Sequence, residues 1–381
     1  MTRVAFVHDW LTGMRGGEKV LEVMCERFPS ASLFTLVHVP GSVSPAIERL
    51  RPRTSFIQRL PMVTRLYRQY LPLFPAAVEQ FDFDGYDVIV SVSHCCVKSI
   101  VKPGAARHLC YCLTPMRYAW DQFDAYFGPD RIGAGASRLM RPVMARMARW
   151  DRDTAGRADR YVAISHYVAG RIRRYYNREA TVVYPPVDTD FFRPGDSDSG
   201  HSRSALIVSA LVPYKRIEVA IEACRLAGIP LTIAGDGPDR ARLERLAGSR
   251  GNDVKFLGRV SDDDLRTLYQ GSAVTILPGE EDFGIVPLEA QACGRPVVAL
   301  NRGGAQETVL EGETGTLVDD GSAPAFADAI ARTVACTFDP AVIRGHAERF
   351  SRTRFGDEMQ ALIEQEMDSV PVGVPVQSEG A

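Results

Sequence analysis

Short apolar runs alternate with longer amphipathic stretches along this chain, and this alternation constrains the fold more than any other feature. In the first half we expect strands over 4–7, 88–93, 108–112 and 161–164, with a helix over about 18–27. Strands that alternate with helices predict βαβ units and a parallel sheet. Pro185 and Pro186 then end the pattern, because a proline pair continues neither a helix nor a central strand.

The same pattern restarts at Ala205, which predicts a second half built like the first. We expect strands over 205–210, 231–234, 254–257, 273–277 and 296–299, with a helix over about 216–227. The expected fold class is α/β, with two doubly wound domains over 1–186 and 187–352. A helix over about 353–368 follows and could pack back on the first domain. The loop 195–204 is expected to be mobile, and the tail 369–381, rich in Pro, Gly and Ser, is expected to be disordered.

Composition narrows the class of protein. The chain has 381 residues, of which 45% are hydrophobic and 24% charged; this excludes a disordered or collagen-like chain and fits two domains of about 100–200 residues each. The apolar runs are strand-sized, so no membrane-spanning helix is expected. The run from Val4 to Val7 leads directly into His8 and Asp9 without a secretory signal pattern, and we therefore expect a cytoplasmic protein. The eight cysteines form no C-x-x-C pair for zinc.

Charge is distributed unevenly along the chain. Residues 1–185 carry 26 Lys and Arg against 16 Asp and Glu, whereas the remainder carries 19 against 31. This asymmetry fits two domains that face each other, or a first domain that faces an anionic partner. The 40 arginines against five lysines also fit a bias in genomic base composition.

Two arginine-rich segments, 58–81 and 141–178, mix cations with bulky apolar side chains, and the second carries ten arginines against three aspartates. Such segments bind anionic membrane surfaces at about 1 kcal/mol per basic residue. We therefore expect peripheral contact with the inner face of the plasma membrane. The alternative is an amphipathic helix that packs on its own domain with its arginines in water. No nucleic-acid partner is expected, because no recognised module is present.

The segment 281–289, Glu-Asp-Phe-Gly-Ile-Val-Pro-Leu-Glu, concentrates the chemistry. Pro287 suits the first position of a helix, which would place Glu289 in the first turn. The N–H groups of Phe283, Gly284 and Ile285 and the helix dipole would then face an anion or sugar hydroxyls. In open α/β sheets ligands bind at this mouth, beyond the carboxyl ends of the strands. The alternative is a helix that merely has acidic residues near its start.

This segment resembles the E-x7-E signature of the retaining glycosyltransferases of the large nucleotide-sugar family 4, which have the GT-B fold. The resemblance covers roughly residues 3–365. Further segments resemble motifs of that family in the expected order: Gly16-Gly17-Glu18, Val187-Asp188 with Phe191, Lys215, 234–238 and Gly303-Gly304. The segments 114–120 and 212–216 resemble a bacterial surface-polysaccharide branch that includes mannosyltransferases.

The resemblance implies two Rossmann-like domains facing across a cleft, with the nucleotide-sugar in the second and the acceptor in the first. It implies transfer of a hexose, with mannose from GDP-mannose favoured, to a glycan or lipid-linked saccharide, with retention of configuration. A UDP-sugar donor is the alternative. A sugar-nucleotide epimerase and a sugar-nucleotide-binding protein with weakened catalysis are the other hypotheses.

The resemblance also assigns roles to residues. Lys215 and Arg216 would stabilise the leaving diphosphate, which carries growing charge in the transition state. Glu281 would bind hydroxyls of the transferred sugar, and Glu289 those of the ribose. His94 would contact the donor sugar or handle the acceptor proton, unless it is a structural histidine. The remaining implied contacts are Gly16, Gly17, Gly237, Phe283, Gly284 and Ile285 for the donor and Arg117 and Tyr118 for the acceptor.

Two positions depart from the family pattern. Leu113 stands where many relatives carry histidine, and Ala210 stands where most carry an arginine that contacts the diphosphate. Both departures put catalytic strength in doubt. D-x-D patterns are too frequent in this chain to indicate a metal site, and cations with helix N-termini would supply the required positive charge. We therefore predict a metal-independent enzyme without a cofactor.

Overall fold

The computed structural model describes residues 2–195, 203–249 and 253–369 of the chain. The chain divides into two compact units. Unit 1 comprises residues 1–164, 169–183 and 356–381, and unit 2 comprises 165–168 and 184–355. Most of the loop expected to be mobile and nearly all of the expected disordered tail lie outside the described residues.

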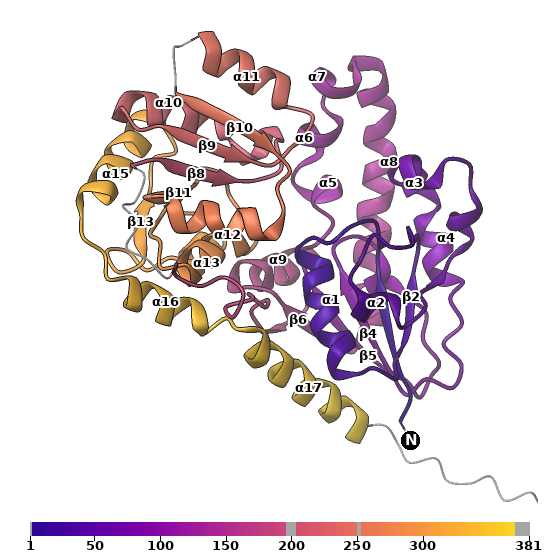
Figure 1. The fold of residues 1–381 in the computed structure, drawn as a ribbon. Helices are drawn as coiled ribbons and strands as arrows, with labels where there is room; N and C mark the ends of the chain where they lie inside the picture. Colours follow the sequence, from indigo (N-terminus) through magenta and orange to yellow (C-terminus); the bar gives the residue numbers. More distant parts are fainter. Residues whose placement is uncertain (1, 196–202, 250–252, 370–381) are drawn as a thin grey trace, which may run out of the picture. The chain divides into compact units, whose positions relative to one another are not determined.

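Unit 1 is built on a parallel seven-stranded sheet with the order β3-β2-β1-β4-β5-β6-β7 (Figure 1). Its strands are β1 (Val4–His8), β2 (Ser32–Thr35), β3 (Arg53–Thr54), β4 (Val88–Ser93), β5 (Arg107–Cys112), β6 (Arg160–Ala163) and β7 (Ala180–Val182). The longer helices are α1 (Gly16–Arg27), α8 (Ala134–Asp153), α9 (His166–Tyr176) and α17 (Arg352–Asp368). Shorter ones include α3 (Val63–Leu66), η2 (Tyr67–Leu73), α4 (Phe74–Glu79), η3 (Val97–Ser99), α5 (Arg117–Trp120), α6 (Phe123–Phe127) and α7 (Pro129–Ile132).

Unit 2 repeats this plan with a parallel six-stranded sheet of order β10-β9-β8-β11-β12-β13. Its strands are β8 (Ala205–Val208), β9 (Leu231–Ala234), β10 (Val254–Gly258), β11 (Val274–Leu277), β12 (Val297–Leu300) and β13 (Gly315–Val318). Its main helices are α10 (Ile217–Ala227), α11 (Arg240–Ser249), α12 (Asp262–Gly271), α13 (Ile285–Ala292), α14 (Ala305–Thr308), α15 (Ala323–Ala335) and α16 (Pro340–Glu348).

Alternating side chains on the unit 2 strands feed two separate cores. Ala205 and Ile207 belong to the core beneath α10 and α15, whereas Leu206 between them belongs to the core beneath α12 and α13. Because successive side chains of a strand point to opposite faces, such a doubly covered strand is apolar at every position. Figure 1 shows helices on both sides of this sheet.

Each sheet reverses its strand order at its first strand. In unit 1, β1 lies between β2 and β4, and in unit 2, β8 lies between β9 and β11. The connections leave these neighbouring strands in opposite directions, which opens a crevice beyond their carboxyl ends where α/β proteins bind ligands. The residues that follow β1 and β4, and those that follow β8 and β11, are therefore the first candidates for function.

The C-terminal helix α17 contacts the rest of unit 1 through several polar pairs. Asp357 accepts a hydrogen bond from Arg27 at 2.6 Å, and Glu366 accepts one from Arg107 at 2.9 Å. Glu366 is only 5% exposed although it is charged, whereas the Arg107 side chain is 35% exposed, so this second pair is partly buried. These contacts place most of α17 in unit 1, while the first residues of the helix belong to unit 2.

Candidate functional site

The strand-order reversal of unit 2 brings Lys215 and Glu281 together. Lys215 follows β8 and Glu281 follows β11, and the lysine Nζ forms an ion pair with Glu281 Oε1. The two side chains are 17% and 15% exposed. Two residues 66 positions apart are thus joined at the edge where the topology predicts a ligand site.

A glycine permits this approach of the two loops. A Cβ on Gly279 would lie 2.8 Å from the carbonyl oxygen of Tyr214 and 2.9 Å from the Cα of Lys215. Atoms do not come this close without displacement, so only glycine lets the loop after β11 lie on the backbone of Lys215. Gly237, predicted to contact the donor, has the same role: its Cβ would lie 2.4 Å from the carbonyl oxygen of Leu211.

The helix that follows Glu281 begins earlier than predicted. Gly284 is the N-cap with φ 96°, a conformation that glycine adopts readily, and α13 starts at Ile285. Pro287 is therefore the third helical residue, where its missing N–H costs no intrahelical bond. The prediction that Pro287 is the first helical residue is wrong, because the helix begins two residues earlier. Glu289 is consequently the fifth helical residue and lies beyond the first turn, where it was predicted. The N–H groups of Gly284 and Ile285, which have no intrahelical partner, still follow Glu281 by three and four positions in the sequence.

The loop between Glu281 and α13 rests on two glycines after β12. Gly303 forms a bridge with Glu281, and Gly304 donates its N–H to the Glu281 carbonyl at 2.8 Å. Phe283 is 3% exposed and stacks on Tyr184 with ring centroids 5.5 Å apart. Its side chain therefore anchors the loop in the core, so only the backbone of Phe283 remains for the donor contact that was predicted.

Gly304→Ala tests how tightly this loop is held. The new Cβ would lie 2.2 Å from the Cα of Phe283, and we expect the unfolding free energy of unit 2 to fall by about 3 kcal/mol. Urea denaturation of both proteins measures this. The matched control is Gly248→Ala in α11, where nothing lies within 4 Å, and it should leave stability unchanged or higher. Equal stability of Gly304→Ala and the wild type would contradict the packing described.

Glu289 lies in α13 and is 5% exposed. Its Oε2 accepts a hydrogen bond of 2.9 Å from the hydroxyl of Tyr269, which is fully buried. Burial together with the Glu289 carboxylate raises the pKa of Tyr269 well above its usual range, so the phenol stays protonated and donates. Tyr269 was not predicted as a site residue, since one tyrosine within an amphipathic helix gives no signal in a single sequence.

Among the contacts of the described residues, none connects the Arg216 side chain to the ion pair of Lys215 and Glu281. Arg216 has the left-handed backbone conformation with φ 54°, and its guanidinium donates to the Gly321 carbonyl at 2.7 Å. Its position at the N-cap of α10 still brings positive charge to this edge of unit 2.

In unit 1 the strand-order reversal presents His94, which follows β4 and is 29% exposed. Its Nδ1 lies 3.1 Å from the Oδ2 of Asp9, the residue that follows β1. Asp9 is fully buried. Asp9 was not predicted as a site residue. Its position as a charged residue at the end of an apolar strand was the signal that could have indicated it.

The predicted glycine loop lies beside the same strands. Gly16 opens α1, and a Cβ on Gly17 would lie 2.8 Å from Leu113 and 3.3 Å from the ring of His8. Leu113, one of the two departures from the family pattern, is half-buried and packs over this glycine. A Cβ at Gly17 would therefore displace the end of the Leu113 side chain.

The two residues predicted to contact the acceptor lie on the short helix α5. Arg117 is its first residue, and the hydroxyl of the neighbouring Tyr118 lies 2.7 Å from the sulfur of Cys95. Burial raises the pKa of Tyr118 well above its usual range. Tyr118 also packs on Tyr126, so its ring is part of a local aromatic cluster.

Among the described residues, one group of potential metal ligands lies within reach of a single ion: Asp9, Cys95 and Cys96. The Asp9 oxygens already accept backbone N–H bonds, and burial raises the pKa of both thiols, which keeps them protonated. Thiolates are the ligands that metals require. The group therefore does not fit a metal, and metal independence of the reaction stays a prediction.

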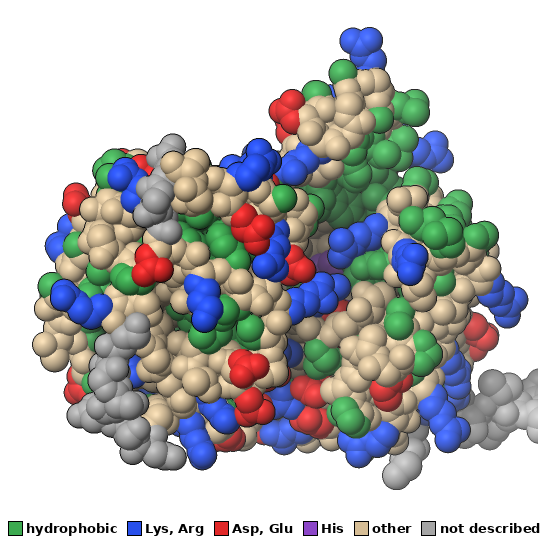
Figure 2. Space-filling model, turned by 45° about the horizontal axis from the view of Figure 1, so that its top comes forward, with side chains coloured by type: hydrophobic (Ala, Val, Ile, Leu, Met, Phe, Trp, Pro, Cys, Tyr) green, Lys and Arg blue, Asp and Glu red, His purple; other side chains and the backbone are tan. Residues whose placement is uncertain are grey.

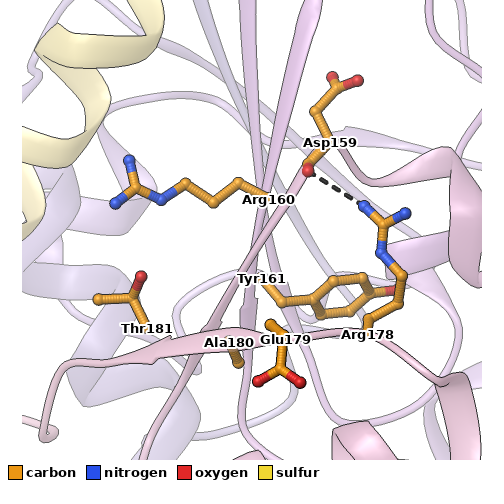
Figure 3. A pocket seen from close by; sticks show the side chains of 7 residues that line it. All are labelled: Asp159, Arg160, Tyr161, Arg178, Glu179, Ala180 and Thr181. Carbon is orange, nitrogen blue, oxygen red and sulfur yellow. Dashed lines mark hydrogen bonds between the residues drawn. The ribbon is translucent and has the colours of Figure 1, made fainter.

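A cavity of about 440 Å³ in unit 1 lies at the wrong edge of the sheet for a substrate site. It is lined by residues at the amino ends of β6 and β7, among them Arg160 and Arg178 (Figure 3). Arg178 donates to the carbonyls of Ala158 and Asp159 and lies beside the ring of Tyr161, while Arg160 points away from it. Ligands of parallel sheets bind at the carboxyl ends of strands, so we assign this cavity no role in the reaction.

A basic and apolar surface covers residues 59–62, α3, η2 and α6–α8 of unit 1. Leu139 is 73% and Met62 60% exposed. Exposed arginines of the surface are Arg59, Arg65, Arg68, Arg138, Arg141, Arg146 and Arg149. Figure 2 shows hydrophobic side chains gathered at the upper right, with Lys and Arg around them. One face of α8 packs on the core through Met144 and Met147, as the alternative interpretation expected, but Leu139 remains in water.

Two Rossmann-like α/β domains in one chain define the GT-B class of fold, and solved structures confirm this predicted class. The HepE protein of Anabaena in complex with UDP has a TM-score of 0.70 at 19% identity, covering 96% of this chain and all of that one. Sucrose-phosphate synthase of Thermosynechococcus elongatus has a TM-score of 0.69 at 20% identity, covering 97% of this chain and all of that one.

Sequence comparison points to glycosyltransferases. Residues 190–350 match the family model described as glycosyl transferases group 1, so this match falls in unit 2. The D-inositol 3-phosphate glycosyltransferase of Acidothermus cellulolyticus is 34% identical over 241 residues, 55% of this chain and 54% of that protein. The enzyme of the same name in Mycobacterium bovis is 38% identical over 167 residues, 39% of this chain and 35% of that protein. The chain thus spans about half or less of the length of these curated relatives.

The comparisons and the described residues leave several predictions open. The chain passes between the units after residues 164, 168, 183 and 355, and the expected domain bounds and the cleft between the domains stay predictions. No helix among the described residues is long and apolar enough to cross a membrane. The roles of the site residues, the donor and the acceptor also stay predictions.

Proposed function

We propose that this protein is a nucleotide-sugar-dependent glycosyltransferase that moves a hexose to a saccharide acceptor with retention of configuration. The observation that carries the proposal is the pairing of Lys215 with Glu281 at the carboxyl edge of unit 2, directly before the N-terminus of α13. A cation, a carboxylate and free helix N–H groups in one place match a ligand with both diphosphate and hydroxyl groups.

Each group has a task in breaking the bond between the sugar and the diphosphate. Lys215 would offset the negative charge that grows on the leaving oxygen, and the N–H groups before Ile285 would hold phosphate or sugar oxygens. Glu281 would accept hydrogen bonds from sugar hydroxyls once the donor separates it from Lys215, and Glu289 would do the same for the ribose. No carboxylate is required as a nucleophile if the leaving phosphate helps to deprotonate the acceptor on the same face.

We propose GDP-mannose as the donor, on the similarity of segments 114–120 and 212–216 to the surface-polysaccharide branch. A UDP-hexose is the alternative, because the Anabaena protein of the same fold was solved in complexes with UDP and with UDP-glucose. The proposed reaction proceeds without a metal. The acceptor is proposed to be a glycan or lipid-linked saccharide on the cytoplasmic side of the membrane.

Donor consumption followed by proton NMR tests the activity. The wild-type protein should release nucleoside diphosphate from one donor class, faster with a lipid-linked saccharide than without, and EDTA should not slow it. The anomeric proton of the product reports retention directly. Donor binding without hydrolysis or transfer over a panel of acceptors would instead favour the sugar-nucleotide-binding protein, which Leu113 and Ala210 motivate. Isomerised donor without an acceptor would favour an epimerase.

Membrane contact is proposed through the basic and apolar surface of unit 1. Leu139→Glu should weaken binding to vesicles with about 30% anionic lipid by about tenfold. The change removes an apolar side chain that would insert into the membrane and adds a negative charge that the anionic lipid repels. Co-sedimentation at two salt concentrations measures this. Leu226→Glu is the matched control, because Leu226 is 47% exposed on α10 of unit 2. If Leu139→Glu and Leu226→Glu bind equally well, the surface is not the contact.

A further inference from the structure

The buried carboxylate of Asp9 accepts hydrogen bonds from the loop that contains His94. Asp9 Oδ2 accepts the backbone N–H groups of His94 at 2.7 Å and Cys95 at 2.9 Å. Its Oδ1 accepts those of Cys96 at 2.8 Å and Val97 at 3.1 Å. Four consecutive amides therefore converge on one fully buried side chain. These bonds fix the backbone of His94 relative to the end of β1.

The same carboxylate also holds the side chain of His94. The Oδ2 of Asp9 lies 3.1 Å from Nδ1, and the indole of Trp10 packs edge-on against the imidazole, with centroids 4.4 Å apart and planes at 85°. Asp9 and Trp10, the two residues that follow β1, thus fix the orientation of the His94 ring, the first through Nδ1 and the second by packing against the ring. His94 remains 29% exposed, whereas Asp9 has no exposure.

The charges around this pair decide its protonation. Burial raises the pKa of Asp9, but His94 and the backbone N–H bonds outweigh it, so the pKa lies below its usual value and the carboxylate is ionised. Burial lowers the pKa of His94, and Asp9 offsets this only in part. The other charged or titratable groups that face this pair are His8, Arg15, Glu18, Cys95 and Cys96. The imidazole is therefore neutral at pH 7.

An ionised carboxylate only accepts hydrogen bonds, so Nδ1 must carry the proton of the neutral ring. We infer that Asp9 is a positioning residue that locks His94 in the Nδ1–H tautomer and leaves Nε2 as a hydrogen-bond acceptor for a substrate hydroxyl. No partner of Nε2 occurs within residues 2–195, 203–249 and 253–369. This inference rests on the proposed function for the identity of the hydroxyl, which belongs to the sugar donor or the acceptor. If Nδ1 carries the proton, the neutral ring of His94 cannot donate a hydrogen bond from Nε2 to a sugar hydroxyl. Of the two roles predicted for His94, handling of the acceptor proton then remains.

The tautomer is measured directly by NMR of the full chain with ¹⁵N-labelled histidine. The His94 signals are assigned by their loss in His94→Gln. Near pH 7.5 the expected pattern is a protonated Nδ1 and an unprotonated Nε2. A protonated Nε2, or a ring protonated on both nitrogens, would overturn the inference. This readout does not depend on any transferase activity, so it stands even if no donor is consumed.

Asp9→Asn tests the consequence for the reaction. It should lower kcat by about 10²-fold and alter the tautomer pattern of His94, while donor-induced thermal stabilisation is kept. The matched control is Asp87→Asn at the opposite end of β4, where the carboxylate also accepts a backbone N–H, that of Arg3 at 2.7 Å, but at an exposed position. Unchanged kcat and tautomer in folded Asp9→Asn would overturn the inference. If the wild type transfers no sugar, the proposed function fails, whereas the NMR pattern still decides the role of Asp9.

Discussion

Lys215→Ala is expected to lower kcat for sugar transfer by about 10²–10³-fold, the loss typical of one group that stabilises developing charge. The lysine is held beside the start of α13 by Glu281, and the described site offers no second lysine there: the nearest cation in sequence, Arg216, donates to Gly321. Steady-state kinetics with saturating donor measure kcat. Lys255→Ala is the control, because Lys255 is an exposed lysine on β10 of the same unit.

The partner of Lys215 gives this prediction a second test. Glu281→Gln should lower kcat/KM for the donor by about 10–100-fold, because a hydrogen bond to a charged group is worth about 1.5–3 kcal/mol. The double variant should lose less than the product of the two single losses, since the side chains form one ion pair. Near-normal kcat in both single variants would remove this pair from the active site.

Glu289→Ala is the second change with a large expected effect. It should raise KM for the donor and lower kcat/KM by about 10²–10³-fold, because it removes a nearly buried carboxylate and leaves the Tyr269 hydroxyl buried without its acceptor. Tyr269→Phe removes the hydrogen bond to Glu289 and keeps the ring, and should cost about tenfold in the same constant.

Glu289→Ala and Tyr269→Phe are tested by their affinity for the free nucleotide as well as by their turnover. If Glu289 binds the ribose, Glu289→Ala should weaken binding of the nucleoside diphosphate itself, as measured by calorimetry. The control is Glu313→Ala, an exposed glutamate of unit 2. Unchanged affinity for the nucleotide in Glu289→Ala, with a stable fold, would place the ribose elsewhere.

Much of the fold could be predicted from the sequence because its central strands are short, apolar and buried on both faces. The ranges 88–93 and 231–234 were predicted residue for residue, and they form β4 and β9. The edge strands β3 and β7 were missed, because their residues are exposed or half-exposed and carry little apolar pattern. Strands β2 and β13 were also missed, since Ser, Thr and Gly weaken their apolar runs.

The candidate site was predicted less completely than the fold. Lys215 and Glu281 were each named, but their ion pair depends on the strand order and on the small size of Gly279, which no local pattern reveals. Tyr269 and Asp9 were missed for a related reason. A single buried polar residue gains its meaning from a partner distant in sequence, and such a partner becomes visible only in the folded chain.

Thermal unfolding of the wild type and Lys215→Ala with GDP-mannose, UDP-glucose and ADP-glucose tests most directly whether this edge of unit 2 binds a nucleotide-sugar. A ligand that binds only the folded state raises stability by RT ln(1 + [L]/Kd). We expect one nucleotide class to raise the Tm of the wild type, with or without EDTA, and to raise that of Lys215→Ala much less, while Lys255→Ala behaves like the wild type. A shift of equal size in Lys215→Ala, or no shift with any donor, would contradict the proposed site.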